Sequence, residues 1–292
     1  MSAWAMVGIG FAIFFVAGFY RELSTKACLN PKAKSKLPTF EPMDEVKVLI
    51  LGDQGSGDKC QAEVALAMEK VAAEKGADLV LLLGDNFIQH GIKDTDDKQI
   101  QSKFESVYKL DLPFFAVLGN HDFKGNWKAQ IELTDLNPRW NMPGATYFFE
   151  AGPVAFYGIN TTCSICSIFS LFKKTKKPWR IAFGHHPMVS TGRHGGMLKS
   201  EQWVIRKTKI DTYFSGHHHL LEHIKLEGVD QITSGAGGTN LNEKEERDHP
   251  GKQFYLLEHG FVWAKFTQTE ALYEFYDKTG ALAYQFDRDK KG

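Results

Sequence analysis

Five short apolar runs in this chain each end in a glycine that is followed by a side chain able to bind a metal ion. The stretch SGHHHL at 215–220 stands out, because three of only 11 histidines are consecutive there. Carboxylate oxygens, an amide oxygen and imidazole nitrogens are ligands suited to iron, manganese or zinc. The residues that follow the five glycines are Asp53, Asp85, Asn120 with His121, His185 with His186, and His217 to His219.

Any one of these runs would be weak evidence, since a glycine often ends a strand. All five runs, however, have the length and the β-branched or aromatic content of strands. Helix-periodic segments at 64–76 and 100–107 separate the early ones. Strands that alternate with helices predict a largely parallel sheet, in which the residues after the strands converge at one edge. A carboxylate there can bridge two cations about 3.5 to 4 Å apart, and Asp85 is the natural bridge.

The motifs GDQG, GDNF, GNHD, AFGHHP and GHHH, in this order, resemble the five motif blocks of the metallophosphoesterases. They are most similar to those of the small purple acid phosphatases of the tartrate-resistant type. The resemblance runs from about Val46 to the C-terminus, and it implies an α/β fold, a four-layer α/β/β/α sandwich of two mixed sheets. We expect the strand-like runs FVWAKF, ALYEFYD and ALAYQF to complete the second sheet.

The resemblance also implies a ligand set for two metal ions, which would be Fe, Zn or Mn. Asp53 and His219 would bind one metal, Asp85 would bind both, and His218 would be a spacer. The other metal would take the remaining three side chains of the set, Asn120, His185 and His217.

Two further histidines correspond to the substrate-site histidines of the family. They are His121 and His194, of which one would protonate the leaving alkoxide. His194 also fits a surface loop, and a packing role fits His186, which stands where the family has tyrosine.

Position 88 departs from the family. Purple members have a tyrosine that binds ferric iron there, whereas GDNFI offers Ile88, which cannot bind a metal. The remaining ligands suit a pair of divalent ions, so we expect a colourless protein. His90 is a candidate replacement ligand, although an ordinary solvated loop histidine explains it more simply.

The expected activity is hydrolysis of phosphate monoesters, in a small molecule or a phosphoprotein, with a metal-activated hydroxide as the nucleophile. One alternative is a phosphodiesterase that uses the same site. Another is a non-catalytic, membrane-tethered interaction module on this fold. Lys+Arg and Asp+Glu balance at 35 each, so no general positive charge indicates a nucleic-acid partner.

The N-terminal stretch 3–20 is uncharged, mostly apolar and long enough to cross a bilayer as a helix. We expect a membrane anchor or signal segment at 1–22, a linker at 23–44 and the metallophosphoesterase domain at 45–292. An anchor implies a single-pass membrane protein, and a signal implies export. The five basic residues between 21 and 36 favour a cytoplasmic domain, whereas the family resemblance favours secretion.

A short segment, CSICSIFSLFKKTKK, replaces a longer one of the family. Cys163 and Cys166 either form a local disulfide or remain thiols. The apolar run 165–172 and the lysines after it fit an interfacial membrane segment or, more ordinarily, a core-packed helix with a solvated end.

Overall fold

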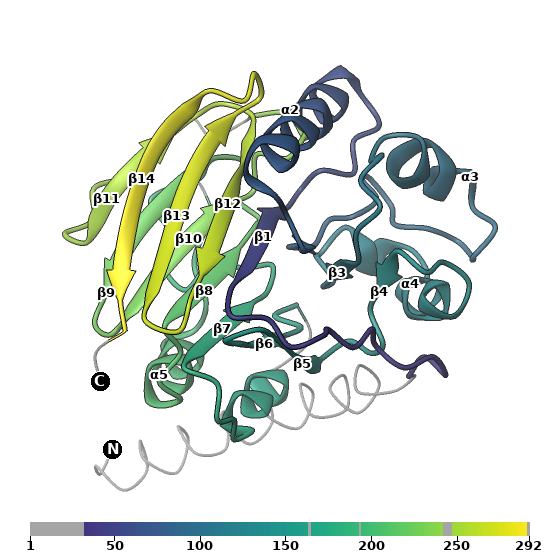
Figure 1. The fold of residues 1–292 in the computed structure, drawn as a ribbon. Helices are drawn as coiled ribbons and strands as arrows, with labels where there is room; N and C mark the ends of the chain where they lie inside the picture. The colour runs from purple at the N-terminus through teal and green to yellow at the C-terminus, as the bar shows by residue number, and fades with distance from the viewer. Residues whose placement is uncertain (1–31, 163–164, 193, 242–246, 291–292) are drawn as a thin grey trace, which may run out of the picture.

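The computed structural model describes residues 32–162, 165–192, 194–241 and 247–290. Within these residues, two mixed sheets of seven strands each lie face to face (Figure 1). The first sheet has the order β14-β13-β12-β1-β2-β3-β4. Its strands are β1 (Val46–Leu51), β2 (Leu79–Leu82), β3 (Phe114–Ala116), β4 (Trp140–Asn141), β12 (Gly260–Phe266), β13 (Glu270–Asp277) and β14 (Leu282–Asp289).

The second sheet has the order β11-β9-β10-β8-β7-β6-β5. Its strands are β5 (Tyr147–Ala151), β6 (Val154–Gly158), β7 (Trp179–Phe183), β8 (Thr212–Ser215), β9 (Leu221–Leu226), β10 (Val229–Ser234) and β11 (Lys252–Leu256). One apolar core joins the inner faces of the two sheets, since the side chains of β1 and β2 cluster with Phe183 and Phe214. This architecture confirms the expected sandwich of two mixed sheets.

Helices cover the outer faces of the sandwich. They are α2 (Lys59–Lys75), α3 (Lys98–Ile100), α4 (Trp127–Glu132) and α5 (Lys199–Lys207), together with a π-helical turn η1 (Gln101–Glu105) and the 3-10 segments η2 (Asp122–Lys124), η3 (Leu133–Asp135) and η4 (Ile165–Phe172). Helix α2 begins where the Asp58 side chain accepts from the N–H groups of Cys60 and Gln61, and it ends at Gly76 with φ 82°. Its apolar positions face the first sheet, as their spacing predicts.

The expectation for the three C-terminal strands is wrong. Strand β12 pairs antiparallel with β1, with Leu49 opposite Trp263, so β12, β13 and β14 belong to the first sheet. Strand β1 has β2 on one side only, and β12 satisfies the backbone groups on its other side. The strands β9 to β11 complete the second sheet instead.

The segment before β1 packs against the domain from residue 33 onward. Backbone N–H groups of Lys34 and Ser35 donate to the Asp135 carboxylate. The ring of Phe40 lies 6.1 Å from that of Phe115 and 6.3 Å from that of Phe149. The part of the expected linker that the structure describes therefore covers one end of the apolar core.

Segment η4 packs into the second sheet, with Ile168 and Leu171 buried in a cluster that also holds Val204 and Ile205 of α5. This packing favours the core-packed helix for 165–172. The expected anchor at 1–22 and the side chains of Cys163 and Cys166 lie outside the described residues. In the described part of the chain, no helix is long and apolar enough to cross a bilayer.

Replacing Phe40 with alanine tests the packing of this segment. We expect Phe40→Ala to lower the free energy of unfolding by about 1 to 3 kcal/mol, because it removes a partly buried ring from an aromatic stack. Urea unfolding measures the change. Thr39→Ala, at the exposed neighbouring position, is the control and should change the free energy of unfolding by less than about 0.5 kcal/mol. Equal values for the two variants would mean that the segment does not support the core.

Candidate metal centre

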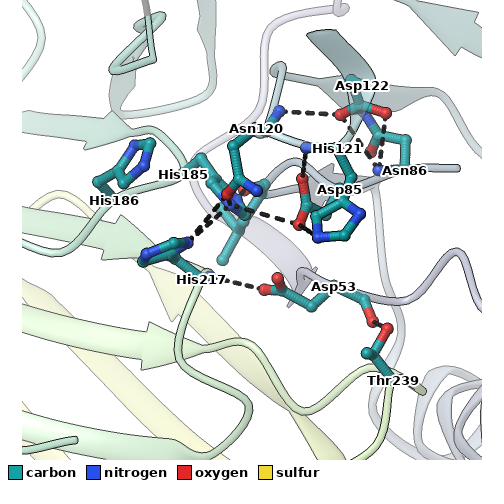
Figure 2. Close-up of polar contacts among 12 residues, drawn as sticks. Asp53, Asp85, Asn86, Asn120, His121, Asp122, His185, His186, His217 and Thr239 are labelled. Atoms are coloured by element: carbon teal, nitrogen blue, oxygen red, sulfur yellow. Dashed lines mark hydrogen bonds and ion pairs between the residues drawn. The ribbon is translucent and has the colours of Figure 1, made fainter. Parts of the chain in front are cut away.

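Loops from both sheets meet at the carboxyl ends of β1, β2, β3, β7 and β8 (Figure 2). Backbone hydrogen bonds tie the two sheets together beside these loops. The Gly52 N–H donates to the Ser234 carbonyl at 2.7 Å, and the Gly237 N–H donates to the Gly52 carbonyl at 3.0 Å. The predicted convergence of residues from 53 to 219 therefore occurs at one place.

Two of the glycines that precede predicted ligands lie where a side chain would collide with a carboxylate of the site. A Cβ on Gly119 would lie 2.2 Å from Asp85 Oδ1, and one on Gly216 would lie 2.5 Å from Asp53 Oδ2. The repeated glycine thus allows neighbouring loops to approach the carboxylates.

Three of the predicted ligands have a left-handed backbone. Asp53, Asp85 and His217 have φ values of 56°, 54° and 69°. This conformation is uncommon for residues other than glycine and costs about 1 to 3 kcal/mol each, so it persists only where surrounding contacts hold it. Such contacts are present: the His217 N–H donates to Asp53 Oδ2 at 2.7 Å, and the Asp53 N–H donates to the Gly84 carbonyl at 3.0 Å.

One group of predicted ligand atoms consists of Asn120 Oδ1, His185 Nε2 and His217 Nδ1. The amide oxygen lies 3.0 Å from the first nitrogen and 3.1 Å from the second, and the two nitrogens are 3.2 Å apart. His185 Nδ1 lies 3.0 Å from the Leu83 carbonyl and therefore carries the proton in the neutral ring. Burial lowers the pKa of His185, but the charges of Asp85 and Asp53 outweigh burial and raise it, so a proton or a metal cation is favoured at Nε2, which faces the Asn120 oxygen.

The Asp53 carboxylate also lies close to an imidazole nitrogen. Its Oδ1 is buried and has no hydrogen-bond partner among the described residues. His219 Nε2 lies 3.5 Å away, while Nδ1 of that ring donates to the Asn240 carbonyl at 2.7 Å. His219 Nε2 thus faces a second buried carboxylate, whose negative charge favours a proton or a metal cation at this nitrogen.

Asp85 lies between these two groups. Its Oδ2 is 3.6 Å from His185 Nε2, and its Oδ1 accepts the His121 N–H at 2.8 Å. Ligand atoms of Asp53, Asp85 and His185 all lie within 4.8 Å of one another, and all three side chains are buried. Converging lone pairs repel one another unless a proton or a cation lies between them, and carboxylate and imidazole donors at this spacing suit metal ions.

Residues 46–221, more than half of the chain, match the family described as calcineurin-like phosphoesterase. The chain is a calcineurin-like metallophosphoesterase. Members of this family use a binuclear metal centre, and the buried Asp/His group of this chain lies where its motifs place one.

Several relatives are similar to this metallophosphoesterase over most of its length. Purple acid phosphatase 4 of Arabidopsis thaliana is 26% identical, over 90% of each chain. Human tartrate-resistant acid phosphatase type 5 is 27% identical, over 72% of this chain and 78% of its own. These similarities confirm the predicted relationship to the purple acid phosphatases as a distant one.

Solved structures show the same fold. One is described as "GAP50 the anchor in the inner membrane complex of Plasmodium"; its TM-score is 0.75 at 22% identity, over 86% of this chain and 90% of that one. Another is the purple acid phosphatase PPD1 from yellow lupin, Lupinus luteus, with a TM-score of 0.68 at 17% identity, over 86% of this chain and 55% of that one.

The electrostatics of the metallophosphoesterase site favour bound cations. Burial lowers the pKa of His219, but the adjacent Asp53 carboxylate outweighs burial and raises it to about 9. Burial raises the pKa of Asp85, and the nearby His185 only partly offsets this. Burial, with His185 beside it, lowers the pKa of His217, so this imidazole is neutral and free to act as a ligand at pH 7.

Asp122 organises the loops beneath the site, a role that the sequence did not reveal. Its buried carboxylate accepts the Gly119 N–H at 2.8 Å, the Asn86 N–H at 3.1 Å and the Gln130 side-chain amide at 2.8 Å. These bonds join the loop after β2 to the loop after β3 (Figure 2). The motif GNHD contains this residue and its partner Gly119, but Asn86 and Gln130 come from other parts of the chain.

His121 lies at the accessible side of the site, with its Nε2 4.0 Å from Asp85 Oδ2 and its Nδ1 2.9 Å from the Gln89 carbonyl. Lys124 was not singled out from the sequence. Its Nζ lies 3.1 Å from Nδ1 and 3.4 Å from Nε2 of His121. A positive charge therefore stands beside the predicted substrate-site histidine.

The remaining histidines of the prediction are spread around the site. His194 is exposed, with its ring 4.9 Å from that of His217. His186 Nδ1 lies 3.0 Å from Thr161 Oγ1, and burial lowers the pKa of its ring to about 3. His218 is buried, with its Nε2 2.9 Å from Ser190 Oγ.

Ile88 is half-buried, and its backbone is held by the Gly55 carbonyl, to which its N–H donates at 2.9 Å, and by the Lys103 ammonium. His90 is exposed. Within the described residues, no hydrogen bond or ion pair joins the His90 side chain to the predicted ligands. The suggestion that His90 replaces the missing tyrosine thus gains no support and stays a prediction.

Substituting the central carboxylate tests the ligand set. We expect Asp85→Ala to retain fewer than one metal ion per chain where the parent retains two, because the variant lacks the only ligand predicted to be shared. Elemental analysis after metal loading and gel filtration measures the ratio. Asp94→Ala, in an exposed loop, is the control and should keep both ions. Two ions retained in Asp85→Ala would refute the bridge.

Proposed function

We propose that this metallophosphoesterase hydrolyses phosphate monoesters at a centre of two divalent metal ions. The six predicted ligands would divide as the family resemblance implies, with Asp85 between the ions. The observation that carries the proposal is the convergence of buried donor atoms of Asp53, Asp85 and His185 at the strand ends, where Asp53 Oδ1 has no hydrogen-bond partner among the described residues. A binding module without metals would gain nothing from this buried, mutually repelling arrangement.

When bound, the two cations would supply charge stabilisation for the phosphoryl oxygens and lower the pKa of a water molecule. The chain's own residues would do the rest. His121 would donate a proton to the leaving oxygen, since its ring borders Asp85 and is held by the Gln89 carbonyl. Lys124 would bind a phosphate oxygen beside it, and the exposed His194 would contact the substrate from the side of His217.

A second candidate function is that of a membrane-tethered anchor on this fold. Two observations favour it: Ile88 stands where purple members carry a metal ligand, and the fold is shared with GAP50, which is described as an anchor in a membrane complex. A phosphatase would turn over a phosphate ester in an assay, whereas a non-catalytic anchor would not.

An assay of aryl phosphate against bis-aryl phosphate, with metal content measured on the same preparation, tests the proposal. We expect two divalent ions per chain and faster turnover of the monoester. Faster turnover of the diester would indicate a phosphodiesterase. Full metal loading without turnover of either compound would favour the anchor and contradict the proposed hydrolysis.

The proton-donor role of His121 can be isolated by varying the leaving group. We expect His121→Ala to keep its metal ions and to lose roughly 100-fold or more in kcat for alkyl phosphates, but less for nitrophenyl phosphate, because an acid matters most when the leaving oxygen is basic. Steady-state kinetics over a series of esters checks this. The exposed Asp94→Ala is again the control. A uniform loss over the series, or a loss of metal, would make His121 a structural residue.

The side chain at position 88 should determine whether the iron-loaded protein absorbs visible light strongly. Iron-loaded parent protein should show no intense visible band, because a charge-transfer band of this kind needs a phenolate on ferric iron. Ile88→Tyr should create such a band if the side chain faces the metal, and Ile88→Phe, which lacks the hydroxyl, should not. Absorption spectroscopy before and after reduction measures it. A purple parent protein would show that another tyrosine has taken the place of the missing ligand.

A further inference from the structure

Two basic segments form one surface on the outside of the second sheet. The segments 172–177 and 198–209, together called the basic patch, contain eight lysines and arginines. Their one acidic residue is Glu201, which is buried. The chain as a whole carries no net charge, so this surface concentrates positive charge that the rest of the molecule balances.

Arg180 fixes the two segments side by side. Its guanidinium donates to the carbonyls of Leu171 and Lys173 at 2.5 and 3.3 Å on one side, and its Nε donates to the carbonyl of Thr208 at 3.1 Å on the other. Below the surface, η4 and α5 share one apolar cluster. The patch is therefore one continuous surface, although its segments are more than 20 residues apart in sequence.

Large apolar side chains are exposed within this positive charge. Phe172 is 52% exposed, Leu198 49% and Trp203 58%. On α5, Trp203 is four residues from Lys199 and from Lys207, which places the three on one helical face opposite the buried Ile205. Exposed aromatic rings among lysines are typical of surfaces that lie at the boundary between lipid headgroups and acyl chains.

The basic patch faces away from the candidate metal centre. Lys177 precedes β7 and Lys209 precedes β8, and these strands are neighbours and parallel. Their amino ends carry the patch, and their carboxyl ends lead to His185 and His217. Figure 1 shows α5 on the lower side of the molecule, the side on which the chain also runs into β1.

We propose that the basic patch docks on the surface of an anionic bilayer. Its positive charge would attract acidic headgroups, and the rings of Phe172 and Trp203 would insert beside them. Two carboxylates border the patch: Glu150 accepts a hydrogen bond from Thr175, and Asp211 accepts the Arg180 N–H and pairs with Lys290. The sequence supplies a reason for a bilayer to be near, since the apolar stretch 3–20 is expected to enter one, and the 11 residues at 21–31 extend up to about 36 Å.

Quenching of tryptophan emission by brominated lipids tests the proposal on the full chain. Vesicles would contain phosphatidylcholine alone or with about 30 mol% phosphatidylserine. The difference in quenching between the parent and Trp203→Phe reports the depth of Trp203, whatever the N-terminal stretch does. We expect this difference with the acidic vesicles and expect it to fall at least about twofold without phosphatidylserine or in about 0.5 M salt.

Matched charge reversals separate the patch from a general loss of positive charge. The triple variant Lys174→Glu, Lys176→Glu, Lys207→Glu should abolish the Trp203 signal. The control triple Lys98→Glu, Lys109→Glu, Lys128→Glu, also of exposed lysines, should keep it. Equal quenching in parent and Trp203→Phe, or equal effects of the two triples, would overturn the proposal. Binding of the patch to a second copy, a soluble protein or RNA without Trp203 quenching by lipid would overturn it as well.

Discussion

The repulsion among buried acceptors at the strand ends is the constraint on which the rest of this structure depends. Asp53 and Asp85 are almost completely buried, and imidazole nitrogens of His219 and His185 face them. Burying carboxylates away from water costs several kcal/mol unless opposite charge compensates. Three left-handed residues add backbone strain in the same loops. Cations between the acceptors would offset both costs, which is why we interpret the arrangement as a metal centre.

This constraint also explains the architecture around the site. Side chains at Gly119 and Gly216 would collide with the carboxylates of Asp85 and Asp53, and Asp122 holds the loops after β2 and β3 in place. The two sheets are joined at Ser234, beside the same loops. The amino ends of β7 and β8 carry none of the predicted metal ligands. A basic, partly apolar surface lies there, so membrane docking and access to the site would use different faces of the molecule.

Much of the site could be predicted from the sequence, because each strand is a continuous apolar run that ends at a glycine and a polar ligand type. Parallel strands then bring Asp53 and Asp85 together whatever the details of the loops. Other features depend on contacts distant in sequence. Nothing in FVWAKF indicates that it pairs with β1, and nothing in the composition of 32–44 indicates that Phe40 stacks on the core. Lys124 reaches His121 only because the chain turns through η2, which the alternation of strands and helices does not predict.

The most direct measurement of the central claim is anomalous diffraction from crystals of the metal-loaded protein, recorded on both sides of the absorption edge of the metal. We predict two peaks about 3.5 to 4 Å apart, with the Asp85 carboxylate between them. One peak should adjoin Asp53 and His219, and the other should adjoin Asn120, His185 and His217. An absence of peaks at the strand ends, or a single peak that Asp85 does not contact, would contradict the account.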